Sequence, residues 1–283
     1  MTIKITDQDF PPLQEYIQQQ CGIVLRDTQQ YLLESRLQHL LSMHQCGTFG
    51  EFLRLVKEKN SPVLREKIVN AMTTNETFWF RDSHPWQNFA AHLLPQWEKE
   101  LQNSLHKKRI WSAAASMGHE AYSMAMLIDD FCGSRHKCAM KNSVEILGTD
   151  ISTSALYVAI SGNYDEMAMS RGFTPPFDGY RRTCFKQTGK VWEISSHIKK
   201  MVVFKQFNLQ NSFITLDKFD LICLRNVIIY FSDEFKRALF KKIAQTLNPG
   251  GYLLLGASET PIRYTRRFRS VKLGDSVYYQ LKE

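Results

Sequence analysis

From residue 109 onward, short apolar runs alternate with longer amphipathic runs, and this alternation restricts the possible folds more than any other feature of the chain. The short runs, each predicted to be a strand, cover 109–114, 144–148, 201–207, 219–224 and 252–255. Amphipathic runs such as 152–160 and 233–247 separate them, which is typical of a mainly parallel sheet of Rossmann type. Two last runs, 268–273 and 277–281, are predicted to add antiparallel strands at one edge.

The first 70 residues have a different pattern, because apolar side chains recur there at helical spacing. Leu33, Leu37 and Leu40 lie three or four positions apart, as on one face of a helix. Ser61 followed by Pro62 predicts the start of a further helix, since proline is favoured at the first helical position. We expect a small unit of four short helices without catalytic groups.

These patterns predict a helical domain over 1–72 and an α/β domain over 91–283. The linker between them, 73–90, is expected to carry part of a ligand site. Within the α/β domain, 173–203 interrupts the alternation with two prolines, two glycines and an alternating run. There we expect an antiparallel β-subdomain with a tight turn at Thr188-Gly189.

Composition excludes several classes of protein. No apolar run approaches the roughly 20 residues that span a bilayer, and the first residues lack the layout of a signal peptide. We therefore expect a cytoplasmic protein without membrane insertion. The six cysteines form no CxxC pair or His/Cys cluster, so we expect reduced thiols and no metal site. By default we expect a monomer.

The net charge of +8 is unevenly distributed. Residues 1–70 carry equal numbers of basic and acidic side chains, whereas 176–205 and 263–269 are basic. Such patches attract nucleic acid or an acidic protein, or they are simply solvated surface. Charge alone leaves these alternatives open.

Polar or small residues lie where predicted strands end, which is where an α/β domain binds a ligand. Gly118 and the small residues at 113–116 allow close backbone approach at the first turn, but the GxGxxG phosphate cradle is absent. Asp150 follows a strand directly and is suited either to ribose hydroxyls or to capping the next helix. Asn226 ends another strand and is suited to a pocket or a turn.

The segment 75–81 combines polar and aromatic residues and is a poor solvated helix. We interpret it as a segment packed over a ligand, with Asn75, Thr77 and Arg81 as its polar groups. Glu120 is suited to holding a cationic amino group, or to the first turn of a helix, where the dipole favours an acid.

Residues 72–81 read MTTNETFWFR and closely resemble the signature of the bacterial chemotaxis receptor glutamate methyltransferases, the CheR family. Four further blocks match in order: IWSAA at 110–114, GTDIS at 148–152, RNVIIYF at 225–231 and PGGYLLLGASE at 249–259. The resemblance spans almost the whole chain. It implies an S-adenosylmethionine-dependent enzyme that forms glutamate γ-methyl esters on the cytoplasmic helical bundle of a chemoreceptor.

The resemblance also implies site residues. Arg81 would lie near the methyl group and Tyr230 beside it, facing the acceptor carboxylate, while Glu120 would meet the methionyl amine and Asp150 the ribose. The residues implied for the cofactor are Asn75, Thr77, Arg81, Ala113, Gly118, Glu120, Asp150, Asn208, Leu209, Asn226 and Val227. Arg36 and Arg26 of the helical domain would contact the receptor. Because a carboxylate is already ionised at pH 7, Arg81 and Tyr230 would orient the acceptor and no general base is required.

Two features depart from the family pattern. His119 stands where the family has an acid; we expect it to be exposed at a helix start, the alternative being a pH-sensitive cofactor affinity. The predicted hairpin at 185–191 is short, which favours an enzyme that does not bind a receptor's C-terminal pentapeptide.

Two rival functions are a nucleic-acid methyltransferase and a non-catalytic S-adenosylmethionine-binding adaptor. The first usually has Pro-Pro and an aromatic residue after the strand-end Asn, whereas Asn226 precedes Val-Ile-Ile. The second would not need both Arg81 and Tyr230. We therefore predict the protein methyltransferase.

Overall fold

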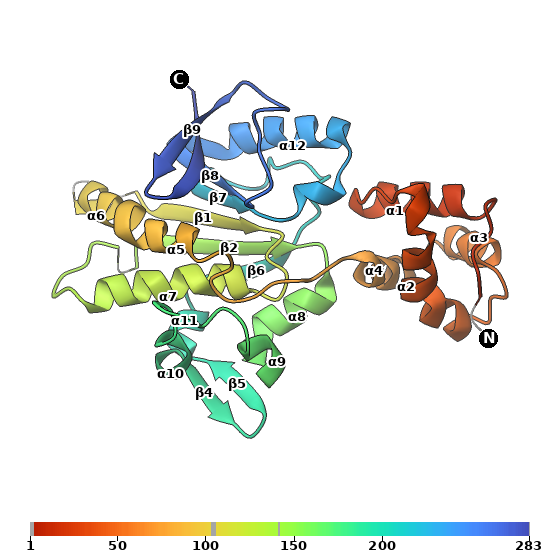
Figure 1. Ribbon diagram of the computed structural model, residues 1–283, viewed down its shortest axis with the longest axis horizontal. Coiled ribbons are helices and arrows are strands. Elements are labelled where there is room, and N and C mark those ends of the chain that lie inside the picture. The colour runs from red at the N-terminus through yellow and green to blue at the C-terminus, as the bar shows by residue number, and fades with distance from the viewer. Residues whose placement is uncertain (1–2, 103–105, 141, 283) are drawn as a thin grey trace.

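The computed structural model describes residues 3–102, 106–140 and 142–282. A seven-stranded sheet with the order β6-β2-β1-β7-β8-β10-β9 lies at its centre (Figure 1). The strands are β1 (Lys108–Ala113), β2 (Val144–Asp150), β6 (Val202–Gln206), β7 (Phe219–Leu224), β8 (Leu247–Leu255), β9 (Phe268–Leu273) and β10 (Ser276–Leu281). The first five pair in parallel, and β10 is antiparallel to β8 and β9. This confirms the predicted Rossmann-like sheet with an antiparallel edge.

Helices cover both faces of the sheet, because successive strand residues point to opposite faces. Ile110 packs in one buried cluster with residues of α6 and α7, whereas its neighbour Trp111 packs in another with residues of α12. The helices around the sheet are α5 (His84–Asn88), the π-helix η2 (Phe89–Leu93), α6 (Leu94–Gln102), α7 (His119–Gly133), α8 (Thr153–Ser161) and α12 (Asp233–Thr246). A 3₁₀ turn, η3 (Ile228–Tyr230), follows β7.

The predicted helices of the first 70 residues form a unit with its own buried core. Its elements are α1 (Phe10–Cys21), the 3₁₀ turn η1 (Asp27–Gln29), α2 (Gln30–Met43), α3 (Phe49–Lys59) and α4 (Pro62–Met72). The helix α4 begins at Pro62 as expected, and the Ser61 side chain caps it by accepting the N–H of Leu64. The unit lies beyond the ends of β1 and β2 (Figure 1). It contacts the α/β part through an antiparallel bridge between Ile23 and Phe231.

The antiparallel insert is present as a three-stranded sheet with the order β3-β5-β4. Its elements are β3 (Asn163–Tyr164), α9 (Glu166–Met169), α10 (Tyr180–Thr183), β4 (Phe185–Thr188), β5 (Val191–Ile194) and α11 (Ser196–Lys199). The turn between β4 and β5 is Gly189-Lys190, and Gly189 has a φ of 61°. The strand β3 precedes the predicted insert, because two residues are too short to give a sequence pattern.

One expected boundary differs. The predicted strand 252–255 is longer in the structure, because β8 begins at Leu247 and includes residues 248–251. Pairing with β7 explains this, since Phe219 lies opposite Leu247 and a register shift follows before Leu221 pairs with Tyr252. The strand partner thus overrides the turn preference of Pro-Gly-Gly.

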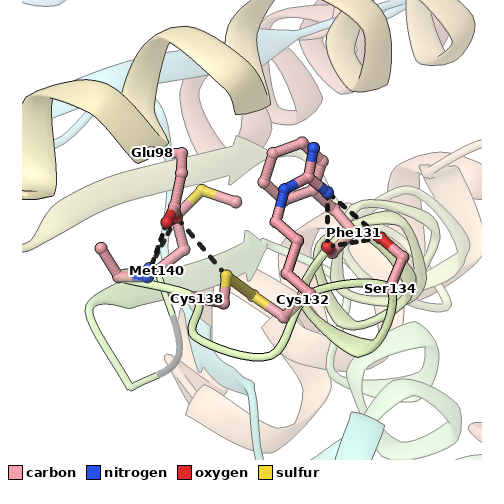
Figure 2. The surroundings of a disulfide bond; sticks show 8 residues. Glu98, Phe131, Cys132, Ser134, Cys138 and Met140 are labelled. Atoms are coloured by element: carbon pink, nitrogen blue, oxygen red, sulfur yellow. Dashed lines mark hydrogen bonds between the residues drawn. A yellow bond between two sulfur atoms is a disulfide. The ribbon is translucent and has the colours of Figure 1, made fainter.

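The expectation of reduced thiols is wrong for one pair, because Cys132 and Cys138 form a disulfide at the end of α7 (Figure 2). The chain turns back after α7 and brings their Cα atoms to 5.3 Å, within the range that a disulfide requires. The carboxylate of Glu98 accepts the N–H groups of Ala139 and Met140 beside it. The other four cysteines are buried and free.

In the part of the chain that the structure describes, no helix is both long and apolar enough to cross a membrane.

Candidate active site

A pocket lies at the carboxyl ends of the parallel strands, where β1 separates β2 on one side from β7 on the other. The chain order reverses at this point, and α/β sheets bind ligands in such a crevice. The space that its walls enclose, including the part open to solvent, measures about 980 Å³. The predicted site residues that line it are Asn75, Thr77, Arg81, Glu120, Asp150, Asn208, Leu209, Asn226, Val227 and Tyr230.

The turn after β1 supplies backbone to the pocket. Ala114 and Ser116 both have positive φ, and both line the pocket. Ala113 and Gly118 were also implied for the cofactor, but they do not line the pocket and lie behind the residues that do. Gly118 has a φ of 86°, and a Cβ there would meet the Phe204 ring at 2.9 Å. Glycine therefore allows α7 to begin close against the sheet.

Asp150, the last residue of β2, is a buried acid at the pocket wall. Its Oδ2 accepts the N–H of Ser116 at 2.7 Å, and its Oδ1 accepts the N–H of Ser152 at 2.9 Å. Burial raises the pKa of Asp150, although these N–H donors oppose the shift. The capping alternative is wrong, because Ser152 caps α8 by accepting the N–H of Ala155. Asp150 is left as an acceptor held by the backbone.

The segment 75–81 is divided between the pocket and the core. Trp79 and Phe80 are fully buried; Phe80 stacks on Phe177 at 4.2 Å and donates its N–H to Ser123. Only Phe78 of the three aromatic rings lines the pocket. The segment thus presents one aromatic ring to the pocket and two to the core. The two buried rings anchor the segment and turn Phe78 and its polar neighbours toward the pocket.

His119 is the second correction at this site. It was expected to be exposed, but it is 0% exposed, and its ring lies 4.4 Å from that of Trp79 and 5.1 Å from that of Tyr164. Neither ring nitrogen has a hydrogen-bond partner in the described chain. Burial lowers the pKa of His119 to about 3, so the ring is neutral at pH 7. The aromatic cluster explains this, because the insert folds over a helix start that sequence alone presents as a surface.

Arg225 is a pocket residue that the sequence interpretation missed. Its side chain is 3% exposed and joins two carboxylates, that of Asp82 at 2.6 Å and that of Glu120 at 3.1 Å. It also donates to the carbonyl of Arg81 at 3.0 Å. The other oxygen of Glu120 accepts the Ser112 hydroxyl at 2.7 Å. The guanidinium therefore connects the 75–81 segment, α7 and the end of β7. The sequence did offer one sign of its importance, because Arg225 directly precedes Asn226 in a block that matches the family.

The remaining wall holds Tyr230, which is half-buried. Its carbonyl accepts the N–H of Val24 at 2.9 Å, so the helical unit fixes this part of the backbone. The amide of Asn208 donates to the carbonyl of Gln20 at 2.9 Å, a second link to that unit. Ile23 itself lines the pocket. The two units thus share one site.

The two predicted receptor-contact residues lie away from the pocket lining. Arg36 donates to the carbonyl of Met72 and to the Thr74 hydroxyl, and so holds the start of the linker segment. Arg26 is exposed.

The donor set suits a nucleoside that carries a cationic group. Asp150 offers a carboxylate for ribose hydroxyls, and Glu120 offers one for a cation. Ile151, Leu209 and Val227 line the pocket as apolar surface for a base. Within the described residues, no group of three or more His, Cys, Asp or Glu side chains is arranged to hold a metal. The residues present therefore fit S-adenosylmethionine.

Comparison with known proteins agrees with this fit. Residues 75–277 match the family described as "CheR methyltransferase, SAM binding domain", and residues 8–73 match "CheR methyltransferase, all-alpha domain". A "Chemotaxis protein methyltransferase" of Vibrio parahaemolyticus is 41% identical over 281 residues, which is 99% of each chain. "Chemotaxis protein methyltransferase 1" of Pseudomonas aeruginosa is 39% identical over 279 residues, covering 97% of this chain and 98% of that protein.

Among solved structures, a TehB-like SAM-dependent methyltransferase from Corynebacterium glutamicum is 13% identical and covers 71% of this chain and 96% of its own, with a TM-score of 0.39. That likeness is too distant to carry an argument. The two domain matches and the full-length relatives confirm the family resemblance, the cofactor and the reaction class. The chain belongs to the CheR methyltransferase family and is an S-adenosylmethionine-dependent methyltransferase of chemotaxis.

Proposed function

We propose that the enzyme acts in the cytoplasm, as a monomer, on glutamate γ-carboxylates in the cytoplasmic helical bundle of a chemoreceptor and produces methyl esters. One observation carries this proposal: Arg81 and Tyr230 line the same pocket as Glu120 and Asp150. A guanidinium and a phenol are suited to orient a carboxylate acceptor. The related chemotaxis protein methyltransferases support the same acceptor class.

Bound S-adenosylmethionine supplies an electrophilic methyl group on a sulfonium. Asp150 accepts hydrogen bonds from the ribose hydroxyls, and Glu120 accepts those of the methionyl amine. Asn75, Thr77, Asn208, Leu209, Asn226 and Val227 contact the rest of the cofactor, with Ala113 and Gly118 supporting them from behind. A glutamate acceptor is ionised at pH 7, so the protein need not remove a proton.

Arg81 and Tyr230 orient the acceptor carboxylate and exclude water from it. The guanidinium of Arg81 is held on its inner side, since its Nη1 donates to the carbonyl of Glu76 at 2.9 Å and its Cζ lies 5.4 Å from the Phe78 ring centre. A group already bonded on one side binds the acceptor moderately, which leaves the carboxylate nucleophilic. Alignment of this kind is the main contribution that the protein makes to an in-line transfer.

The receptor docks, on this proposal, against the helical domain, 1–72, where Arg26 and Arg36 contact it. The linker 73–90 and the domain 91–283 then contain most of the cofactor site, which the helical domain completes through Cys21 and Ile23. The two-residue turn between β4 and β5 supports an enzyme that does not use a C-terminal receptor pentapeptide. Tight binding of such a peptide in calorimetry would contradict this part.

The test is transfer of labelled methyl from S-adenosylmethionine to receptor-containing membranes, followed by mild alkali. Methanol released by alkali indicates carboxyl esters, whereas label that resists alkali indicates N-methylation and contradicts the proposal. Tyr230→Phe and Arg81→Ala should lower transfer. Arg182→Ala, which changes an exposed arginine of α10, is the matched control and should not.

A further inference from the structure

Glu259 is a buried acid beside the pocket, in the loop that follows β8. It is 7% exposed. Its Oε2 accepts the N–H of Asn226 at 2.7 Å and that of Gly256 at 2.8 Å, and its Oε1 accepts the N–H of Ile228 at 3.0 Å. One carboxylate therefore accepts hydrogen bonds from the backbone of two loops that are about thirty residues apart in the chain.

No ion pair of Glu259 occurs among the described residues, so these N–H groups are what compensates its burial. Burial raises the pKa of Glu259, and the N–H donors oppose that shift. The carboxylate loses its hydration on burial and forms hydrogen bonds only with backbone N–H groups. Those hydrogen bonds therefore fix the position of that backbone. The backbone concerned is 226–228.

This backbone has an uncommon conformation. Asn226 has a φ of 58°, in the left-handed region, which costs most residues about 1–2 kcal/mol but which asparagine adopts more readily than they do. Space on the other side is filled, because a Cβ on Gly256 would lie 2.8 Å from the amide nitrogen of the Asn226 side chain. The bend directs the chain so that Asn226, Val227 and Tyr230 all line the pocket.

We propose that Glu259 is a positioning residue for cofactor binding: its carboxylate holds 226–228 in the bent form in which this segment completes the pocket. The proposal deepens the proposed function and rests on its assignment of Asn226 and Val227 to the cofactor. It also gives a role to the last residue of the block at 249–259.

The test compares Glu259→Gln with wild type by calorimetric binding of S-adenosylhomocysteine and by hydrogen–deuterium exchange over 226–228. Glutamine keeps the size but presents one N–H₂ group to backbone donors. We expect the Kd to rise at least tenfold and exchange to accelerate, while Glu193→Gln, an exposed glutamate of β5, changes neither. Glu259→Asp, which keeps the charge, should restore part of the affinity.

A folded Glu259→Gln protein with a Kd within twofold of wild type overturns the proposal, even if its Tm is lower, since a purely structural role would lower Tm alone. Where Glu259→Gln does not fold, Glu259→Asp takes its place; a loss of affinity of about threefold or more supports the proposal, and an unchanged Kd overturns it. Neither measurement uses a receptor. A wild type that binds S-adenosylhomocysteine but methylates no receptor therefore contradicts the proposed acceptor and leaves this test intact.

Discussion

His119 should make the stability of this enzyme sensitive to acid. Its ring is fully buried against Trp79 and Tyr164, and both nitrogens lack partners in the described chain. Burial lowers its pKa from 6.5 to about 3 in the folded protein. A group with a depressed folded pKa contributes stability above its unfolded pKa, and this stability is lost as pH falls toward the folded value.

The magnitude follows from the two pKa values. Below about pH 6.5 the unfolded chain binds a proton at this position and the folded protein does not, until the pH approaches 3. Each pH unit in that window lowers the free energy of unfolding by about 1.4 kcal/mol. A change from pH 7 to pH 5 should therefore cost about 2 kcal/mol through His119 alone.

The measurement is urea unfolding at pH 7 and pH 5 of wild type and of His119→Leu, an apolar replacement that cannot titrate. Carboxylates that also respond to pH are common to both proteins and cancel in the comparison. Wild type should lose about 2 kcal/mol more than the variant, whereas His39→Leu, at an exposed position on α2, should behave as wild type. Equal pH dependence of wild type and His119→Leu would refute the reasoning.

Three further predictions concern the pocket and the turn behind it. Arg225→Met should lower the free energy of unfolding by about 2 kcal/mol, which is less than for a fully buried ion pair because the carboxylate of Asp82 is partly exposed. The same change should raise the Kd for S-adenosylhomocysteine in calorimetry, and Arg182→Met, at an exposed position, is the control. Gly118→Ala should cost about 1–3 kcal/mol in urea unfolding, whereas Gly133→Ala, with open space around it, should be neutral. Arg81→Ala should lower turnover far more than cofactor affinity; equal losses would count against its role with the acceptor.

The sequence predicted the sheet and the place of the site for a physical reason. Strands such as 219–224 are apolar throughout because both faces are covered, and a polar residue directly after such a run must lie at the edge of the sheet. Asp150 and Asn226 could be recognised in this way. The role of Arg225 could not be recognised from the sequence. Its side chain pairs with Asp82, which lies in a distant segment of the chain.

Local pattern also could not distinguish which aromatic rings face a ligand. Phe78, Trp79 and Phe80 are consecutive and equally apolar, but positive φ at Phe80 turns the chain so that two rings enter the core. The burial of His119 depends on the same packing with the insert. The Cys132–Cys138 disulfide depends on a chain reversal after α7 that no spacing rule encodes.

Residues at the end of α1 form part of the cofactor pocket, so the helical unit does more than dock a receptor. Cys21 and Ile23 line the cofactor pocket, and the N–H of Val24 holds the Tyr230 carbonyl. Gly22 makes the turn between them with a φ of 77°, and a Cβ there would meet the Phe235 ring at 3.1 Å. A ligand that contacts both units must stabilise their docking by the same free energy that the docking adds to its binding. Cofactor affinity should therefore depend on how the helical unit packs against the α/β domain, whatever receptor binds to that unit.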